Sequence, residues 1–148
     1  MEVLVIGPDP PCIRCSTVHR LAKEVGEQYP GKVEVRRISA SSEEAERYGK
    51  IEGGHHIASA HNVSHDHEKI ESLMKEIEEL KRDEQKNEGL ISEKFTAIDE
   101  ALKPIKEKAK EKGYLMTPVL VVNGKIKSMD YVPEKERIKE WVKMELGH

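Results

Sequence analysis

VLVIGPDPPCIRC, residues 3–15, places the two cysteines of the chain three positions apart, shortly after an apolar run. The run Val3–Ile6 is typical of a buried strand, and the Gly and Pro residues of 7–11 cannot continue it. Apolar side chains then recur at helical spacing before Gly26, at Val18, Leu21, Ala22 and Val25. This stretch therefore predicts a Cys12-x-x-Cys15 pair at a strand-to-helix junction.

Composition narrows the class of protein. The chain has 148 residues, which suits a single domain, and its charges nearly balance at a net charge of -3. A balanced charge gives no reason to expect nucleic acid or an anionic membrane as a partner. The first apolar run is too short for a signal peptide, and no later run approaches the roughly 18 residues of a membrane span. We therefore expect a cytoplasmic protein, in which a lone cysteine pair is catalytic or metal-binding.

The middle of the chain differs in composition from its two ends. A second strand is predicted at 33–38, and the capping-box pattern of Ser41 and Glu44 predicts a short helix before Gly49. From Lys50 to about Lys112 the chain becomes rich in Glu, Lys and His. We interpret residues 50–112 as a helical insertion in a single domain, 1–148.

Two amphipathic helices are predicted within the insertion. Their apolar positions are Ile70, Leu73, Ile77 and Leu80 in the first, and Ile91, Phe95, Ile98, Leu102, Ile105 and Ala109 in the second. We expect Asn87-Glu88-Gly89 to end the first helix, Ser92 to start the second, and Pro104 to kink or restart it. The pattern favours an antiparallel hairpin that packs as an elaboration of the domain. The alternatives are a homodimer interface and a lid over the dithiol.

Strand patterns return near the C-terminus. Residues 117–122 read as a strand, Asn123-Gly124 is a strong hairpin signal, and 125–127 continue as a second strand. After Pro133, the residues Ile138, Trp141, Val142 and Leu146 share one helical face. Without the insertion, the expected order is therefore β-α-β-α-β-β-α, an α/β fold.

This order of elements resembles the thioredoxin and glutaredoxin superfamily, in particular its small prokaryotic redox-active disulfide proteins. The matching motifs are Val3–Ile6, Gly7-Pro8, Cys12 and Cys15, Thr117-Pro118, and Val122-Asn123-Gly124-Lys125. Together they span roughly 85 residues, a plausible size for a minimal version of that fold. The chain departs from the family in a longer loop before Cys12 and in an insertion of roughly 60 residues, which exceeds ordinary loop variation.

The cysteine pair predicts thiol-disulfide exchange. A helix N-terminus lowers the pKa of a thiol, and Arg14 adds a cation if its side chain turns inward. Cys12 is therefore the expected nucleophile, and Cys15 the resolving thiol. The resemblance further implies that Pro118 is a cis proline facing the dithiol and that Thr117 offers main-chain hydrogen bonds to an extended substrate.

We therefore expect a thioredoxin-like disulfide oxidoreductase without a bound cofactor. Its substrate would be a protein or small-molecule disulfide. Electrons would come from a thioredoxin-reductase-like partner or a low-molecular-weight thiol.

A metal-binding or metal-handling protein is the alternative hypothesis. Five histidines cluster in the insertion, at His55, His56, His61, His65 and His67. His61 and His65 would share a face if that stretch were helical, as histidine pairs that bind zinc do. Gly53-Gly54 and Asn62-Val63-Ser64 instead favour a loop with solvated histidines. His19, one turn after Cys15, could be a third ligand beside the cysteines, although packing or solvation is the favoured role.

Overall fold

The computed structural model describes residues 1–9 and 12–147, so Pro10 and Pro11 of the predicted loop lie outside the described residues. The chain divides into two compact units. Unit 1 comprises Met1–Gly53 and Gly113–His148, and unit 2 comprises Gly54–Lys112. Within the described residues, no helix is long and apolar enough to cross a membrane.

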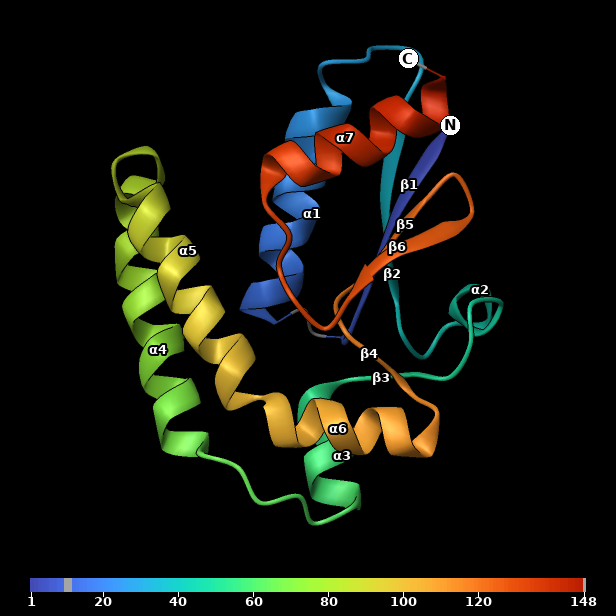
Figure 1. Cartoon of the computed structure of the whole chain (residues 1–148). Coiled ribbons are helices and arrows are strands. Elements are labelled where there is room, and N and C mark those ends of the chain that lie inside the picture. The colour runs from blue at the N-terminus through green and yellow to red at the C-terminus, as the bar shows by residue number, and fades with distance from the viewer. Residues whose placement is uncertain (10–11, 148) are drawn as a thin grey trace. The chain divides into compact units, whose positions relative to one another are not determined.

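Unit 1 contains a mixed four-stranded sheet (Figure 1). Its strands are β1 (Glu2–Gly7), β2 (Glu34–Ser39), β5 (Val119–Val122) and β6 (Lys125–Met129), in the order β2-β1-β5-β6. β1 runs parallel to β2 and antiparallel to β5, and β5 and β6 form the antiparallel hairpin that Asn123-Gly124 predicted. The α/β class expected from the sequence is confirmed.

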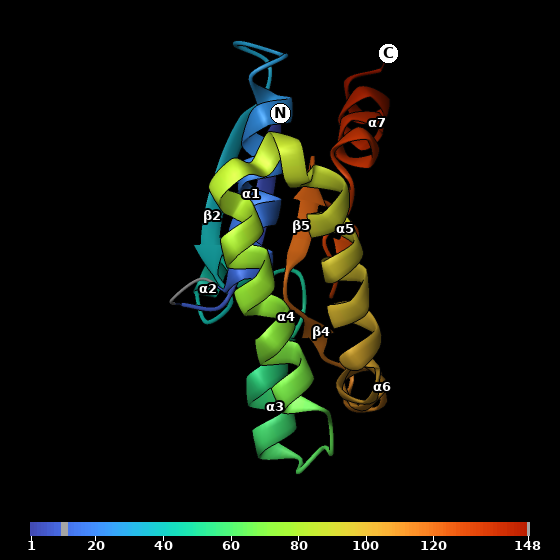
Figure 2. The same ribbon diagram turned by 90° about the vertical axis from the view of Figure 1, so that its left-hand side faces the viewer.

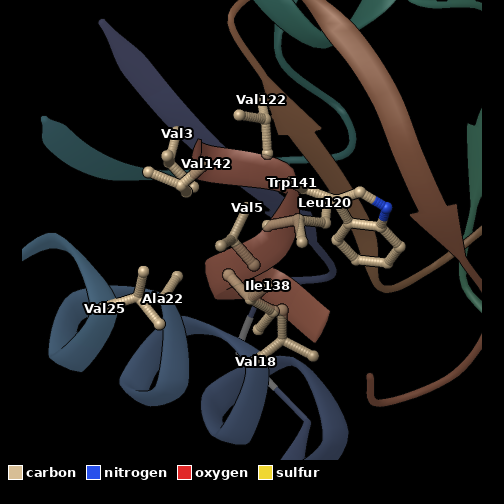
Figure 3. Close-up of a cluster of buried hydrophobic side chains, with 10 residues drawn as sticks. All are labelled: Val3, Val5, Val18, Ala22, Val25, Leu120, Val122, Ile138, Trp141 and Val142. Carbon is tan, nitrogen blue, oxygen red and sulfur yellow. The ribbon is translucent and has the colours of Figure 1, made fainter. Parts of the chain in front are cut away.

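Both faces of the central strands β1 and β5 are buried, which explains why the apolar run of β1 is continuous. Helices α1 (Ile13–Gly26) and α7 (Lys135–Leu146) cover one face (Figure 1). Their cluster with β1 and β5 consists of Val3, Val5, Val18, Ala22, Val25, Leu120, Val122, Ile138, Trp141 and Val142 (Figure 3). The cluster formed by the opposite sheet face and neighbouring segments consists of Leu4, Ile6, Ala45, Ile51, Val119 and Val121. Burial of alternate β1 side chains in these clusters fixes the strand's register.

Unit 1 also contains three features that differ from the sequence prediction. Helix α2 (Glu43–Glu46) begins one residue later than expected, because Ser42 rather than Ser41 accepts the N–H of Ala45. A separate parallel pair, β3 (Ile51–Glu52) with β4 (Leu115–Met116), was not predicted. The strand predicted at 117–122 begins at Val119, after a cis peptide bond between Thr117 and Pro118.

Unit 2 is helical (Figure 2). Its elements are α3 (Gly54–Ala60), α4 (His67–Leu80), a 3-10 turn (Lys81–Asp83), α5 (Glu84–Ala101) and α6 (Lys103–Lys112). Figures 1 and 2 show α4 and α5 side by side, joined by the 3-10 turn. The predicted apolar seams are buried at Ile70, Leu73, Ile77, Ile91, Phe95 and Ile98.

Three helix boundaries in unit 2 test the sequence predictions. Residues 87–89 lie inside α5 rather than ending a helix, and α5 starts at Glu84 instead of Ser92, with the Asp83 carboxylate capping its first turn. Pro104 is the second residue of α6, so the predicted restart is confirmed. The loop predicted at Gly53-Gly54 is wrong in part, because Gly54 begins helix α3.

Candidate active site

The cysteine pair lies at the junction between β1 and α1, as predicted. Cys12 is the N-cap residue of α1, with an extended backbone, and its Sγ accepts the N–H of Cys15 at 3.4 Å. Its carbonyl oxygen accepts the N–H of Ser16 at 2.9 Å, which closes the first helical turn. The first turn of the helix therefore directs a backbone N–H that has no partner within the helix to the Cys12 sulfur.

The two thiols are unlinked and in contact, with a Sγ–Sγ distance of 3.1 Å. This is hydrogen-bonding distance for sulfur, whereas a disulfide bond is about 2.05 Å long. The two cysteines are therefore free thiols that lie close enough together for a disulfide bond to form between them. Cys15 is fully buried, whereas Cys12 is only partly buried, so Cys12 is the more accessible residue of the pair.

Their pKa values separate in opposite directions. The hydrogen bond from Cys15, together with the Cys15 N–H and the charge of Arg14, lowers the pKa of Cys12 to about 6 against the opposing effect of burial. The same hydrogen bond, then burial, then the negative charge on Cys12, raises the pKa of Cys15 far above its usual range. At neutral pH the pair therefore carries one thiolate, on Cys12, and one thiol, on Cys15.

Gly7 allows Cys15 to pack against the end of β1. A Cβ atom at position 7 would lie 2.8 Å from the Cys15 Sγ and 2.9 Å from its Cβ, which is closer than such atoms can approach. Only glycine leaves room for this contact. The sequence marked Gly7 as a strand-to-loop residue, but the close approach depends on how α1 docks on the sheet.

Two arginines lie near the dithiol in unit 1. Arg14 is 4% exposed, and its guanidinium donates a hydrogen bond to the Asp130 carbonyl. Its charge helps to lower the pKa of Cys12 and opposes the rise in the pKa of Cys15. Arg37 donates to the Pro8 carbonyl, and its charge also favours the Cys15 thiolate. The sequence analysis considered an inward Arg14 side chain, but it did not single out Arg37 on β2. The pairing of β2 with β1 brings Arg37 to Pro8, and this register could not be read from the sequence.

The Thr117-Pro118 bond is cis and precedes β5, at the same end of β1 as the dithiol. The register of β1 and β5 pairs Ile6 with Val119, so one residue further along, Pro118 comes opposite Gly7. Thr117 is 3% exposed, and its N–H donates to the Glu52 carbonyl at 3.1 Å. The donor that the family resemblance assigns to a substrate is therefore engaged by β3. Glu52 was not among the residues singled out from the sequence.

The five clustered histidines are spread over α3, the segment after it and the start of α4, and the rings of His65 and His67 meet edge to face, with their centroids 5.8 Å apart. His55 and His56 lie on α3, His61 follows it in a turn, and residues 63–66 are not helical. The His65 Nδ1 lies 3.0 Å from the Val63 carbonyl oxygen. The His67 Nε2 lies 3.1 Å from a Glu71 carboxylate oxygen. Over residues 1–9 and 12–147, no three or more His, Cys, Asp or Glu side chains are arranged to hold a metal ion.

His19 lies one turn after Cys15 and is partly buried. Burial, followed by the positive charges of Lys23 and Arg37, lowers its pKa. Because its pKa is lowered, the His19 side chain is neutral at neutral pH.

No protein-family model, curated protein or solved structure matches this chain. A function for the chain therefore rests on the chemistry of the site itself.

Proposed function

We propose that this chain is a thioredoxin-like thiol-disulfide oxidoreductase that uses Cys12 as nucleophile and Cys15 as resolving thiol. The observation that carries the proposal is the asymmetric pair: two sulfurs 3.1 Å apart, one partly exposed at a helix start and one fully buried. The mixed sheet order β2-β1-β5-β6, with the pair at the end of β1, supports the thioredoxin-like assignment.

The reaction transfers two electrons from the dithiol to a substrate disulfide. The Cys12 thiolate attacks one sulfur of R–S–S–R′, forms the Cys12–S–S–R mixed disulfide and releases R′S⁻, which takes a proton from water. Cys15 then loses its proton and attacks the Cys12 Sγ. The Cys12–Cys15 disulfide forms, and RS⁻ leaves and is protonated.

The raised pKa of Cys15 does not block the second step. Its main cause is the hydrogen bond to the Cys12 sulfur, and a Cys12 that has become part of a mixed disulfide no longer carries a negative charge. The pKa of Cys15 therefore falls at the moment when its thiolate is needed. The positive charges of Arg14 and Arg37 favour that thiolate.

A second exchange must restore the dithiol. A low-molecular-weight thiol, or a reductase of the thioredoxin-reductase kind, supplies the two electrons and is itself oxidised. A cytoplasmic location, where such reductants keep thiols reduced, fits this cycle.

Single-turnover reduction of bis(2-hydroxyethyl) disulfide tests the proposal. Reduced protein, freed of reductant, should release two equivalents of 2-mercaptoethanol and lose two hydrogens in its mass. The Cys15→Ser variant should stop at a 2-mercaptoethanol adduct on Cys12, and Cys12→Ser should form neither product. Wild type and Cys12→Ser reacting at the same rate would remove Cys12 from the mechanism.

A further inference from the structure

In the short parallel pair β3–β4, β3 engages the main chain that leads into the cis Thr117-Pro118 bond. The Leu115 N–H donates to the Lys50 carbonyl at 2.8 Å, and the Thr117 N–H donates to the Glu52 carbonyl at 3.1 Å. We call residues 50–53 the strap. The N–H of Thr117 is therefore already bonded within unit 1, at the position where an extended substrate would need it.

The neighbouring carbonyl groups are engaged as well. The Asp130 N–H lies 3.0 Å from the carbonyl oxygens of both Met116 and Pro118. Pro118 has no N–H to offer. An incoming peptide that accepted the Thr117 N–H would thus have to displace the Glu52 carbonyl.

The strap is held by packing in addition to hydrogen bonds. Ile51 is 6% exposed and belongs to the buried cluster on the second face of the sheet. A Cβ atom on Gly53 would lie 3.8 Å from the Thr117 Oγ1 and 3.9 Å from the Pro8 Cβ. The strap therefore reaches from the core to the loop that leads to Cys12.

We infer that the dithiol acts on compact low-molecular-weight disulfides that need no main-chain pairing, and not on extended polypeptides; this inference rests on the proposed function. Recognition by strand addition takes its affinity from main-chain hydrogen bonds. A tethered strand competes for these bonds at an effective concentration that a free peptide does not reach. The exposed part of Cys12 remains available to a small disulfide, which reacts by the two exchange steps given above.

Two probes that share a 2-mercaptoethanol half and differ in the other half isolate the effect of the peptide chain. One is bis(2-hydroxyethyl) disulfide, and the other is an unstructured peptide whose single cysteine is disulfide-bonded to 2-mercaptoethanol. Each is mixed with reduced, reductant-free protein, and the conversion of the dithiol to the Cys12–Cys15 disulfide is followed after an acid quench. We expect the small disulfide to react about tenfold faster.

The outcomes separate the inference from the proposed function. A peptide that reacts as fast as the small disulfide, or faster, overturns the inference and leaves the oxidoreductase proposal intact. If neither probe oxidises the dithiol, the proposed function fails, and the inference fails with it.

Loosening the strap supplies a second test. Ile51→Ala removes its buried anchor and should raise the peptide rate relative to the small-disulfide rate. Ile38→Ala is the matched control, because Ile38 packs against the same cluster from β2 but is not part of the strap. An unchanged ratio in a folded Ile51→Ala protein contradicts the inference.

Amide hydrogen exchange on the wild-type protein gives a readout that does not depend on the variants folding. The Thr117 N–H should be protected, because it is bonded to the Glu52 carbonyl and its residue is buried. Exchange at the rate of an unstructured amide would show that the strap does not hold the edge, and the inference would fall.

Discussion

Replacing Cys15 with alanine should raise the pKa of Cys12. The hydrogen bond from the Cys15 side chain is the largest of the effects that hold the pKa of Cys12 at about 6. Alanine removes this donor and leaves the Cys15 N–H and the Arg14 charge in place. Serine at position 15 keeps a donor of similar size, so Cys15→Ser is the matched control.

The size of the shift follows from the strength of the lost bond. A hydrogen bond to a charged group contributes about 1.5–3 kcal/mol, and one pKa unit corresponds to about 1.4 kcal/mol. The pKa of Cys12 should therefore rise from about 6 to roughly 7–8 in Cys15→Ala. In Cys15→Ser it should rise by less.

The pH dependence of iodoacetamide alkylation measures this pKa. Only the thiolate reacts, and Cys15 is fully buried, so the reaction in the folded protein reports on Cys12. Peptide mass mapping verifies the modified residue, and circular dichroism verifies the fold across the pH range. A Cys12 midpoint that is the same in wild type and Cys15→Ala would refute the assigned role of the sulfur–sulfur hydrogen bond.

Three further predictions concern stability. Gly7→Ala should lower the free energy of unfolding by about 1–3 kcal/mol in denaturant titrations, because its Cβ would overlap Cys15; an unchanged midpoint would contradict this contact. Gly89→Ala, whose Cβ meets open space on α5, should raise that free energy by about 1 kcal/mol, and a loss would contradict it. The lowered pKa of Cys12 means that the reduced protein should lose stability as pH falls from about 9 to about 6, by at most about 1.4 kcal/mol per pH unit. Cys12→Ser should lack this part of the slope, and equal slopes would count against the thiolate.

Elements with a clear apolar period were predictable from the sequence, because the spacing of their own apolar residues determines which face is buried. The run Val3–Ile6 and the turn Asn123-Gly124 gave the central strand and the hairpin, and Cys12 proved to cap α1. The position of Cys12 at the start of the helix also predicts that its thiol has the lower pKa of the two. How deeply Cys15 is buried does not, because it depends on the close approach to Gly7.

The wrong boundaries in unit 2 have tertiary causes. Asn87 is a poor helix former by itself, but its side-chain N–H donates to the Leu80 carbonyl at 3.0 Å and so satisfies a group at the end of the preceding helix. Helix α3 forms despite Gly54 because Ile57 and Ala58 are buried. In both places, contacts between elements outweigh the local propensity of Gly and Asn.

The parallel pairing of β3 and β4 explains why a long insertion accompanies the hydrogen bond at Thr117. Ile51 pairs with Leu115 in parallel, and parallel strands cannot be joined by a tight turn; they need a crossover of about a dozen residues or more. Unit 2, Gly54–Lys112, is that crossover. A two-residue strand has little intrinsic signal, so neither β3 nor β4 could be read from the sequence. β3, the strand that this connection joins to β4, supplies the Glu52 carbonyl that engages the Thr117 N–H. The long insertion and the engaged N–H of Thr117 are therefore one structural feature, since a connection too short for a crossover would remove both.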